Sequence, residues 1–158
     1  MYDVVALGEL LIDFTTQSTD ADGYPTMAAH PGGAPANFLA AVAQFGGKAA
    51  LLGKVGADTF GKLRAGTLRK AGIETRGIVA SDDVFTTLAF VTLDENGDRE
   101  FAFARKPGAD TQLRFEEIEL SILDETRVFH FGTLSLTDEP ARGTAYRAVE
   151  YAKAHGKL

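Results

Sequence analysis

Short apolar runs alternate along the chain with segments of helical periodicity. Tyr2 to Leu7 is a Val-rich run that ends at Gly8, which is typical of a strand buried on both faces of a parallel sheet. A second run, Leu10 to Phe14, is followed by the polar stretch "TTQSTDADGYPT". Its turn-forming residues predict an exposed connection that leads to a return strand near Met27 to His30.

The next segments predict a helix, a strand and a helix. Proline early and glycines late predict a helix over Pro35–Phe45. Its apolar positions at helical spacing are Phe38, Leu39, Val42 and Phe45. "KAALLGKV" predicts a strand, and "ADTFGKLRAGTLRKAG" predicts a helix with Asp58 as its N-cap and Gly72 as its stop.

The second half of the chain interrupts this alternation. "TTLAFVTLDENGDREFAFAR" has two Thr-, Val- and Phe-rich runs around Asn96-Gly97, which predicts an antiparallel hairpin. A short helix over Glu116–Leu123 and a buried strand over "RVFHFGTLSL" follow. Asp138–His155 predicts a helix, one side of which is lined by small residues suited to packing on a sheet: Ala141, Ala145, Ala148 and Ala152.

These elements predict an α/β sheet with flanking helices and a separate small β layer. The β layer is expected from the Leu10–Gly33 region and the hairpin at 86–105. The last residues, "EYAKAHGKL", are typical of a helix end followed by the start of a strand, as expected after a crossover helix. We therefore expect residues 1–158 to be a truncated part of one α/β domain.

Charge and composition narrow the classes of function. The net charge is −6, so the overall field repels phosphate backbones and argues against nucleic-acid binding. The chain contains no cysteine, which excludes disulfides and thiolate metal sites. The N-terminus lacks a basic segment, and the apolar runs are too short to cross a membrane. A cytoplasmic location without membrane contact is expected.

One candidate motif is a phosphate-binding loop. "GADTFGK", Gly56 to Lys62, satisfies G-x-x-x-x-G-K between a predicted strand and a predicted helix. A P-loop then requires Ser or Thr to hold magnesium, and Leu63 stands there instead. The favoured alternative is a turn and N-cap, with Phe60 and Leu63 facing the core.

A second candidate is the diglycine before the first helix. Gly32 and Gly33 permit positive φ and a close approach of the backbone, and the helix begun near Pro35 directs its first N–H groups at this turn. Asn37, in the first helical turn, can donate and accept hydrogen bonds with a polyhydroxyl ligand. The same residues also fit a Gly-Gly turn with a helix-start asparagine, so both interpretations stay open on this evidence.

The stretch "GGAPAN", then Gly46 and Gly56, resembles the N-terminal signature of the ribokinase-like (PfkB) carbohydrate kinase family. Flanking stretches such as "VVALGELLIDF", "DENGDREFAFARKPGAD" and "VFHFGTLSLTDEP" resemble its fructokinase branch. The resemblance covers essentially the whole chain. It implies a ribokinase-like, Rossmann-like α/β domain with a β lid, here at about 14–33 and 86–105.

The resemblance also implies a set of sugar contacts. Asp13 would accept hydrogen bonds from sugar hydroxyls, and Gly32, Gly33 and Asn37 would contact the same sugar. The expected lid contacts are Phe101, Phe103 and Arg105. Ordinary roles compete with these: a strand-end acid for Asp13, lid packing for the phenylalanines and a solvated strand end for the arginine.

For the whole family member, the resemblance implies ATP and Mg²⁺ as cofactors. The catalytic base is expected in a "GAGD"-like motif, which this chain lacks, so no catalytic, nucleotide or metal-binding residue is assigned here. We expect that the chain alone does not phosphorylate sugar. A noncatalytic sugar-binding or regulatory module of the same fold is the alternative. A homodimer formed through the lid is also expected.

Overall fold

Four parallel strands form the central sheet, sheet A, in the order β5-β4-β1-β8. The computed structural model describes residues 1–93, 96 and 98–158. The strands of sheet A are β1 (Tyr2–Leu7), β4 (Ala49–Gly56), β5 (Ile78–Ser81) and β8 (Thr126–Phe131). The expected buried parallel sheet is confirmed, and eight consecutive buried residues make β4 its most enclosed strand.

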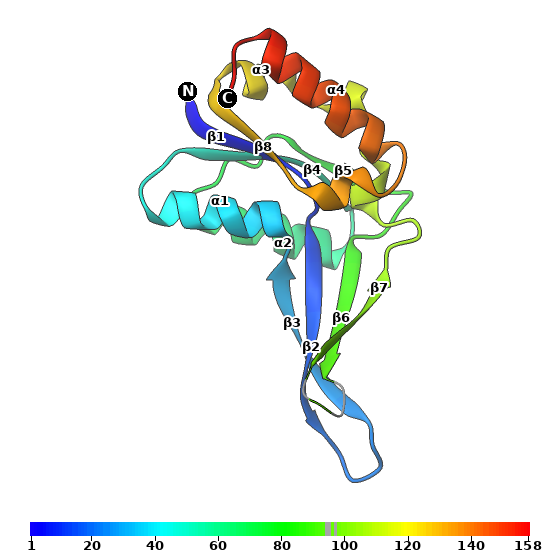
Figure 1. Ribbon diagram of the computed structural model, residues 1–158. Helices are drawn as coiled ribbons and strands as arrows, with labels where there is room; N and C mark the ends of the chain where they lie inside the picture. Colours follow the sequence, from blue (N-terminus) through cyan, green and yellow to red (C-terminus); the bar gives the residue numbers. More distant parts are fainter. Residues whose placement is uncertain (94–95, 97) are drawn as a thin grey trace.

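Helices cover both faces of sheet A (Figure 1). One face carries α1 (Ala34–Gln44) and α2 (Thr59–Lys70), and the other carries α3 (Leu120–Asp124) and α4 (Ala141–Ala154). Successive strand residues point to opposite faces, so Val5 and Leu7 pack in one core cluster and Ala6 in the other. None of the helices in the described ranges is long and apolar enough to cross a membrane.

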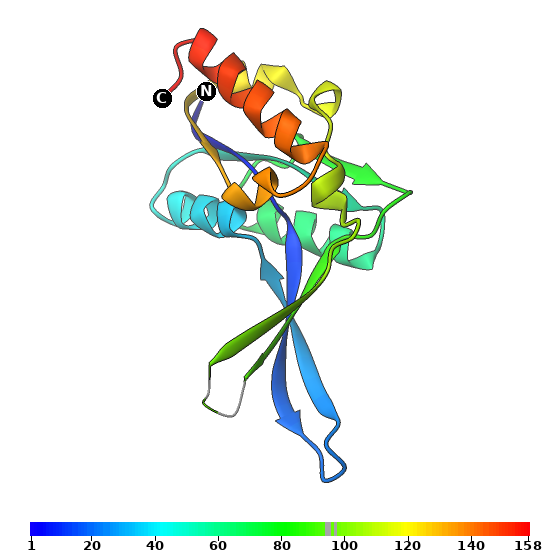
Figure 2. The same cartoon turned by 45° about the vertical axis from the view of Figure 1, so that its right-hand side comes forward.

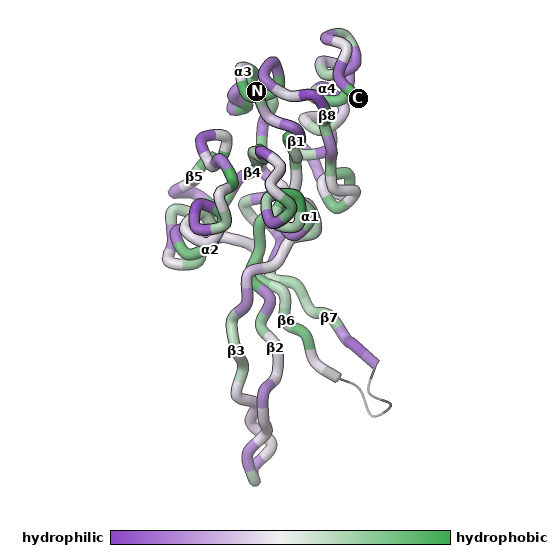
Figure 3. The backbone as a smooth tube through the Cα atoms, turned by 90° about the vertical axis from the view of Figure 1, so that its left-hand side faces the viewer, coloured by the Kyte–Doolittle hydropathy of each residue, from purple (hydrophilic) through white to green (hydrophobic). Residues whose placement is uncertain are grey.

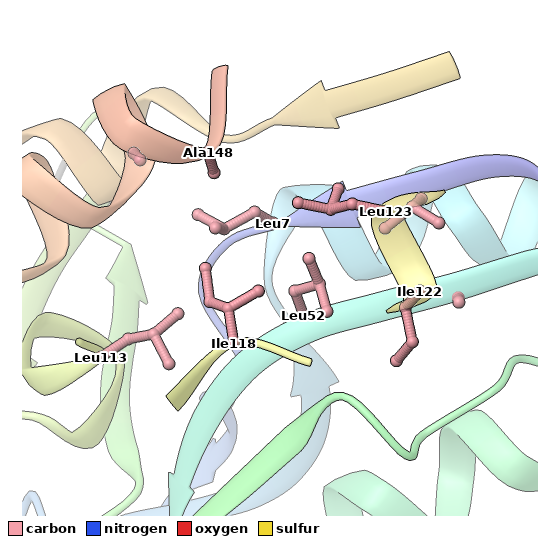
Figure 4. Packing of buried hydrophobic residues seen from close by; sticks show 10 residues of the cluster. Leu7, Leu52, Leu113, Ile118, Ile122, Leu123 and Ala148 are labelled. Atoms are coloured by element: carbon pink, nitrogen blue, oxygen red, sulfur yellow. The ribbon is translucent and has the colours of Figure 1, made fainter. Parts of the chain in front are cut away.

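The larger branched side chains of one core meet the small residues of α4 (Figure 4). Leu7 and Leu52 extend from the sheet toward Ile122, Leu123 and Ala148. The small face expected for α4 is confirmed, since Ala141, Ala145, Ala148 and Ala152 are all buried. Because alanine lets the helix approach closely, the leucines of the sheet are fully enclosed, and burying each stabilises the fold by roughly 1.5–3 kcal/mol.

A second sheet, sheet B, projects from the α/β layer (Figures 1 and 2). Its order is β3-β2-β6-β7; β2 pairs parallel with β6, and the two outer pairs are antiparallel. Its strands are β2 (Leu11–Thr19), β3 (Pro25–Gly32), β6 (Thr87–Leu93) and β7 (Arg99–Ala104). Along β7, hydrophobic residues lie next to the α/β layer and hydrophilic residues lie toward the far end of the strand (Figure 3).

The β2–β3 hairpin is longer than the sequence predicts. Pairing continues from Leu11↔Gly32 to Thr19↔Pro25, so the expected exposed connection shrinks to residues 20–24. Threonine is compatible with both a β-strand and exposure to solvent. The polarity of this segment therefore does not distinguish an exposed strand from a loop. Asp20 closes the turn by accepting hydrogen bonds from the Asp22 and Tyr24 N–H groups.

Other predicted elements begin or end at different residues in the structure. The helix predicted over 116–123 is a 3-10 turn at Phe115–Glu117 followed by α3. The Glu117 carboxylate accepts hydrogen bonds from Lys54 Nζ and the Arg114 N–H, which fixes that turn separately. A short 3-10 turn also forms at Ala109–Gln112. The antiparallel pairing of β6 with β7 is confirmed, but Gly97 of the predicted hairpin turn lies outside the described residues.

The strand predicted over 127–136 ends at Phe131, and Thr133–Leu136 forms another 3-10 turn. The last helix begins at Ala141 rather than at position 138. Leu158 then lies beside β8: its N–H donates to Arg127 O, and its carbonyl accepts from the Phe129 N–H. These are the hydrogen bonds of a parallel pair, so the strand-like character expected for the final residues is present.

Asp58 is the N-cap of α2, as predicted. Its carboxylate accepts hydrogen bonds from Gly61 N (2.8 Å), Thr86 N (2.8 Å) and Thr86 Oγ1 (2.9 Å). The carboxylate therefore occupies the helix N-terminus where a P-loop would hold phosphate, which supports the turn and N-cap interpretation. The expectation that Leu63 faces the core is wrong: it is 46% exposed, and Arg64 is buried instead.

Replacing Asp58 with alanine should lower the free energy of unfolding by about 2 kcal/mol, measured by urea unfolding at pH 7. Burial alone would raise the pKa of Asp58, but hydrogen bonds from Thr86 and Gly61 outweigh it and lower the pKa. The stabilisation is therefore present above the ordinary carboxyl pKa and is lost as pH falls through the lowered value.

The difference in the free energy of unfolding between the wild type and Asp58→Ala should accordingly become smaller in strong acid. Asp82→Ala, an exposed acid in a nearby loop, is the matched control and should stay within about 0.5 kcal/mol of the wild type. A difference that persists unchanged at acid pH would contradict the cap.

Candidate functional site

The two sheets are joined at a diglycine turn between β3 and α1. Gly33 has φ +105°, and a Cβ atom there would lie 2.4 Å from the Glu9 carbonyl oxygen. Only glycine accepts both the positive φ and this contact. The turn predicted from Gly32 and Gly33 is present, and it holds the start of α1 against the link between β1 and β2.

A buried carboxylate completes the start of α1. Glu9 is 4% exposed, and its Oε1 accepts a hydrogen bond from the Ala34 N–H at 2.9 Å. Its Oε2 is buried without a hydrogen-bond partner in the described part of the chain. Burial raises the pKa of Glu9. The residue pattern does not predict a role for Glu9, which lies between two apolar runs.

The register of sheet B places three expected contacts on one face. Asp13 pairs with Ala89, and Ala89 pairs with Phe103. Phe101 lies two residues along β7, and alternate residues of a strand share a face. The rings of Phe101 and Phe103 stack with centroids 6.1 Å apart and are 55% and 50% exposed. Sheet B therefore presents a carboxylate beside an exposed aromatic surface.

A pocket of about 310 Å³ opens along this face. Its lining comes from three strands: Asp13, Thr15, Thr16, Val91, Arg99 and Phe101. Hydroxyls, a carboxylate, a guanidinium and an aromatic ring are groups that bind a polyhydroxyl molecule through hydrogen bonds and apolar contact. The pocket thus joins two of the residues expected from sequence.

Gly32 lies directly beside this carboxylate. A Cβ at Gly32 would come 2.4 Å from Asp13 Oδ2, so glycine at this position makes room for the Asp13 side chain. Burial raises the pKa of Asp13, while the positive charges of Arg64 and His30 act to lower it. The backbone of the turn and the carboxylate of β2 are in contact.

Arg64, for which the residue pattern also predicts no role in the site, contacts the same turn. Its Nε donates a hydrogen bond to Gly32 O at 3.0 Å. The buried stripe of α2 consists of Gly61, Arg64, Ala65 and Leu68. This helical spacing is the sequence signal that could have predicted the burial of Arg64.

Two expected contacts lie elsewhere. Asn37 is exposed in the first turn of α1, and its N–H donates to Gly33 O; within the described ranges, no hydrogen bond joins its side chain to Asp13. Arg105 is held inside the protein, where it donates to Asp110, to Thr137 Oγ1 and to Leu134 O. Their sugar contacts therefore stay predictions, and the solvated strand end considered for Arg105 is wrong.

The model of the pfkB family carbohydrate kinases matches residues 1–158. The chain belongs to this family. It is 45% identical over 157 residues to probable fructokinase-3 of Arabidopsis thaliana, covering 98% of this chain and 46% of the relative. The crystal structure of fructokinase from Xylella fastidiosa superposes with a TM-score of 0.93 at 34% identity, covering 100% of this chain and 49% of that one.

The expected ribokinase-like fold of this pfkB family member is thereby confirmed, and the chain spans about half the length of the curated relatives it matches. A putative ribokinase II from E. coli, crystallised with ATP and Mg²⁺, has a TM-score of 0.90 at 29% identity, covering 100% of this chain and 51% of that one. Across the described ranges, no group of three or more histidine or acidic side chains is arranged to hold a metal ion. ATP and Mg²⁺ are not assigned to residues of this chain.

The diglycine turn gives a direct test. Gly33→Ala should lower the free energy of unfolding by about 3 kcal/mol, because alanine must accept a positive φ and meet the Glu9 carbonyl. The measurement is chemical denaturation monitored by circular dichroism.

Gly66→Ala is the matched control. Gly66 lies within α2, and a Cβ there meets nothing within 4 Å, so alanine should stabilise the protein by about 0.5–1 kcal/mol. Equal effects of the two substitutions would contradict the special role of the turn.

Proposed function

We propose that this chain forms the sugar-binding side and lid of a fructokinase-type kinase, which transfers the γ-phosphate of ATP to a sugar hydroxyl. Family membership and similarity to fructokinases support the reaction class. The observation that carries the site is the shared face of sheet B, where Asp13 and Phe101 line one pocket.

The chemistry of that pocket suits the positioning of a sugar. The two carboxylate oxygens of Asp13 accept hydrogen bonds from neighbouring hydroxyls. Phe101 offers an apolar surface to the C–H groups of the sugar ring, and Gly32 makes room for the Asp13 carboxylate. Phosphoryl transfer depends mainly on positioning and charge stabilisation, so these residues orient the acceptor hydroxyl. ATP, when bound with Mg²⁺, supplies the phosphoryl group.

The base expected from the family's "GAGD"-like motif has no counterpart in this sequence. The purified chain should therefore bind fructose without fructose-dependent ATP hydrolysis or sugar phosphate formation. Binding without turnover is also the behaviour of the noncatalytic sugar-binding alternative. Production of fructose phosphate by the chain together with the missing half of the fold would favour the kinase. The cytoplasmic location and the lid homodimer stay predictions.

Saturating fructose should stabilise the chain. At about 100 times its dissociation constant, a ligand adds about 2.7 kcal/mol to the free energy of unfolding, which a thermal-shift assay detects as a higher melting temperature. Asp13→Asn should abolish this shift because the amide replaces one acceptor oxygen with a donor.

Asp82→Asn is the matched control, since Asp82 is exposed and lies outside the pocket. It should retain the full shift. An unchanged wild-type melting curve at high fructose would rule out a formed sugar site in this chain.

A further inference from the structure

A buried arginine lies in α2 where an apolar side chain is expected. Arg64 is 2% exposed and belongs to the inner stripe of the helix, whereas the neighbouring Leu63 is 46% exposed. Removing a guanidinium from water costs several kcal/mol unless its partners compensate fully. A leucine at position 64 would give α2 an uncharged inner face.

The partners of Arg64 compensate only in part. Its Nε donates to Gly32 O at 3.0 Å. Its Nη2 is buried and has no hydrogen-bond partner in the described part of the chain. A buried donor without a partner destabilises the protein, so packing alone does not explain this arginine.

The charge of Arg64 acts on the sugar site. Gly32 separates the two groups: its carbonyl binds Arg64, and its α carbon lies against the Asp13 carboxylate. Burial lowers the pKa of Arg64 to about 10, and the Asp13 charge acts in the opposite direction. Arg64 therefore remains a cation at neutral pH, close to a carboxylate that burial tends to neutralise.

We propose that Arg64 is a positioning residue of the sugar site: it anchors the Gly32 carbonyl and supplies the positive charge that keeps Asp13 ionised. The proposal extends the proposed function and rests on it. Arg64 acts through Gly32 and Asp13, because its own buried Nη2 is closed to solvent.

Three strands, β3, β6 and β7, place other residues around Asp13. His30 is its register partner on β3, and its positive charge also lowers the pKa of Asp13. The partner on β6 is the uncharged Ala89. From β7, Arg99 and Phe101 line the same pocket. Arg64 is the cation that α2 places beside Asp13.

A purely structural role and a role in the site make different predictions for Asp13. If Arg64 only joined α2 to the turn, Arg64→Leu would weaken the fold and leave the chemistry of Asp13 unchanged. If Arg64 serves the site, leucine also leaves Asp13 without its nearby cation, so Asp13 should titrate at higher pH. Sugar binding should then weaken as well.

The first test is a ligand-free ¹³C NMR titration of the Asp13 carboxyl, assigned with Asp13→Asn. Loss of the positive charge in Arg64→Leu should move the Asp13 midpoint to higher pH. Arg64→Lys should return the midpoint toward the wild-type value. Arg69→Leu, which removes an exposed arginine from the same helix, is the matched control and should leave it unchanged. Equal midpoints in the wild type and Arg64→Leu would overturn the proposal.

The second test measures the dissociation constant for fructose and the free energy of unfolding in the same variants. Arg64→Leu should raise the dissociation constant for fructose by at least about tenfold in protein that is still folded. Wild-type affinity in a destabilised Arg64→Leu would show a structural role only. If the wild type binds no fructose, the proposed function fails, while the titration of Asp13 still decides whether Arg64 controls its charge.

Discussion

The close approach of Gly33 to the Glu9 carbonyl is the constraint on which the molecule depends. At this point the chain leaves sheet B, turns through a positive φ and begins α1 beneath sheet A. The neighbouring Gly32 makes room for Asp13 and accepts a hydrogen bond from Arg64. The Gly32–Gly33 dipeptide thus fixes the positions of the start of α1, the end of β3 and the Asp13 carboxylate.

The two sheets differ in how far the helices cover them. Sheet A is enclosed by helices and supplies the core, whereas much of sheet B is exposed, including Phe101 and Phe103. Arg105 connects the end of β7 to the segment after β8 through Asp110, Thr137 and Leu134. These polar contacts hold the base of sheet B together with its buried apolar residues Leu11, Ile12 and Ala89.

The sequence predicted those features that are set locally. Asp58 capped its helix because an Asp at that position satisfies free N–H groups whatever surrounds it. The alanines of α4 followed from spacing alone. Phe45 ended an apparently apolar stripe, yet it lies just after α1 as its C-cap and is 90% exposed.

Part of the candidate site was predictable because it too depends on local sequence patterns. Strand alternation and pairing brought Asp13 and Phe101 together, and both were expected from family motifs. Arg64 was missed because a charged residue in a helix is ordinarily exposed, and only the contact with Gly32 explains its burial. Arg105 was expected to contact a ligand, which stays a prediction; its hydrogen bonds to Asp110 and Leu134 could not be predicted because they join distant parts of the chain.

The bare aromatic surface of sheet B has a consequence for the behaviour of the protein in solution. Tyr24, Phe101 and Phe103 each expose half or more of their area, and β3 and β7 are unpaired sheet edges. Apolar area beside an open edge favours self-association, which a net charge of −6 opposes only while ionic strength is low. Dilute, low-salt buffer is therefore the condition under which this chain stays dispersed.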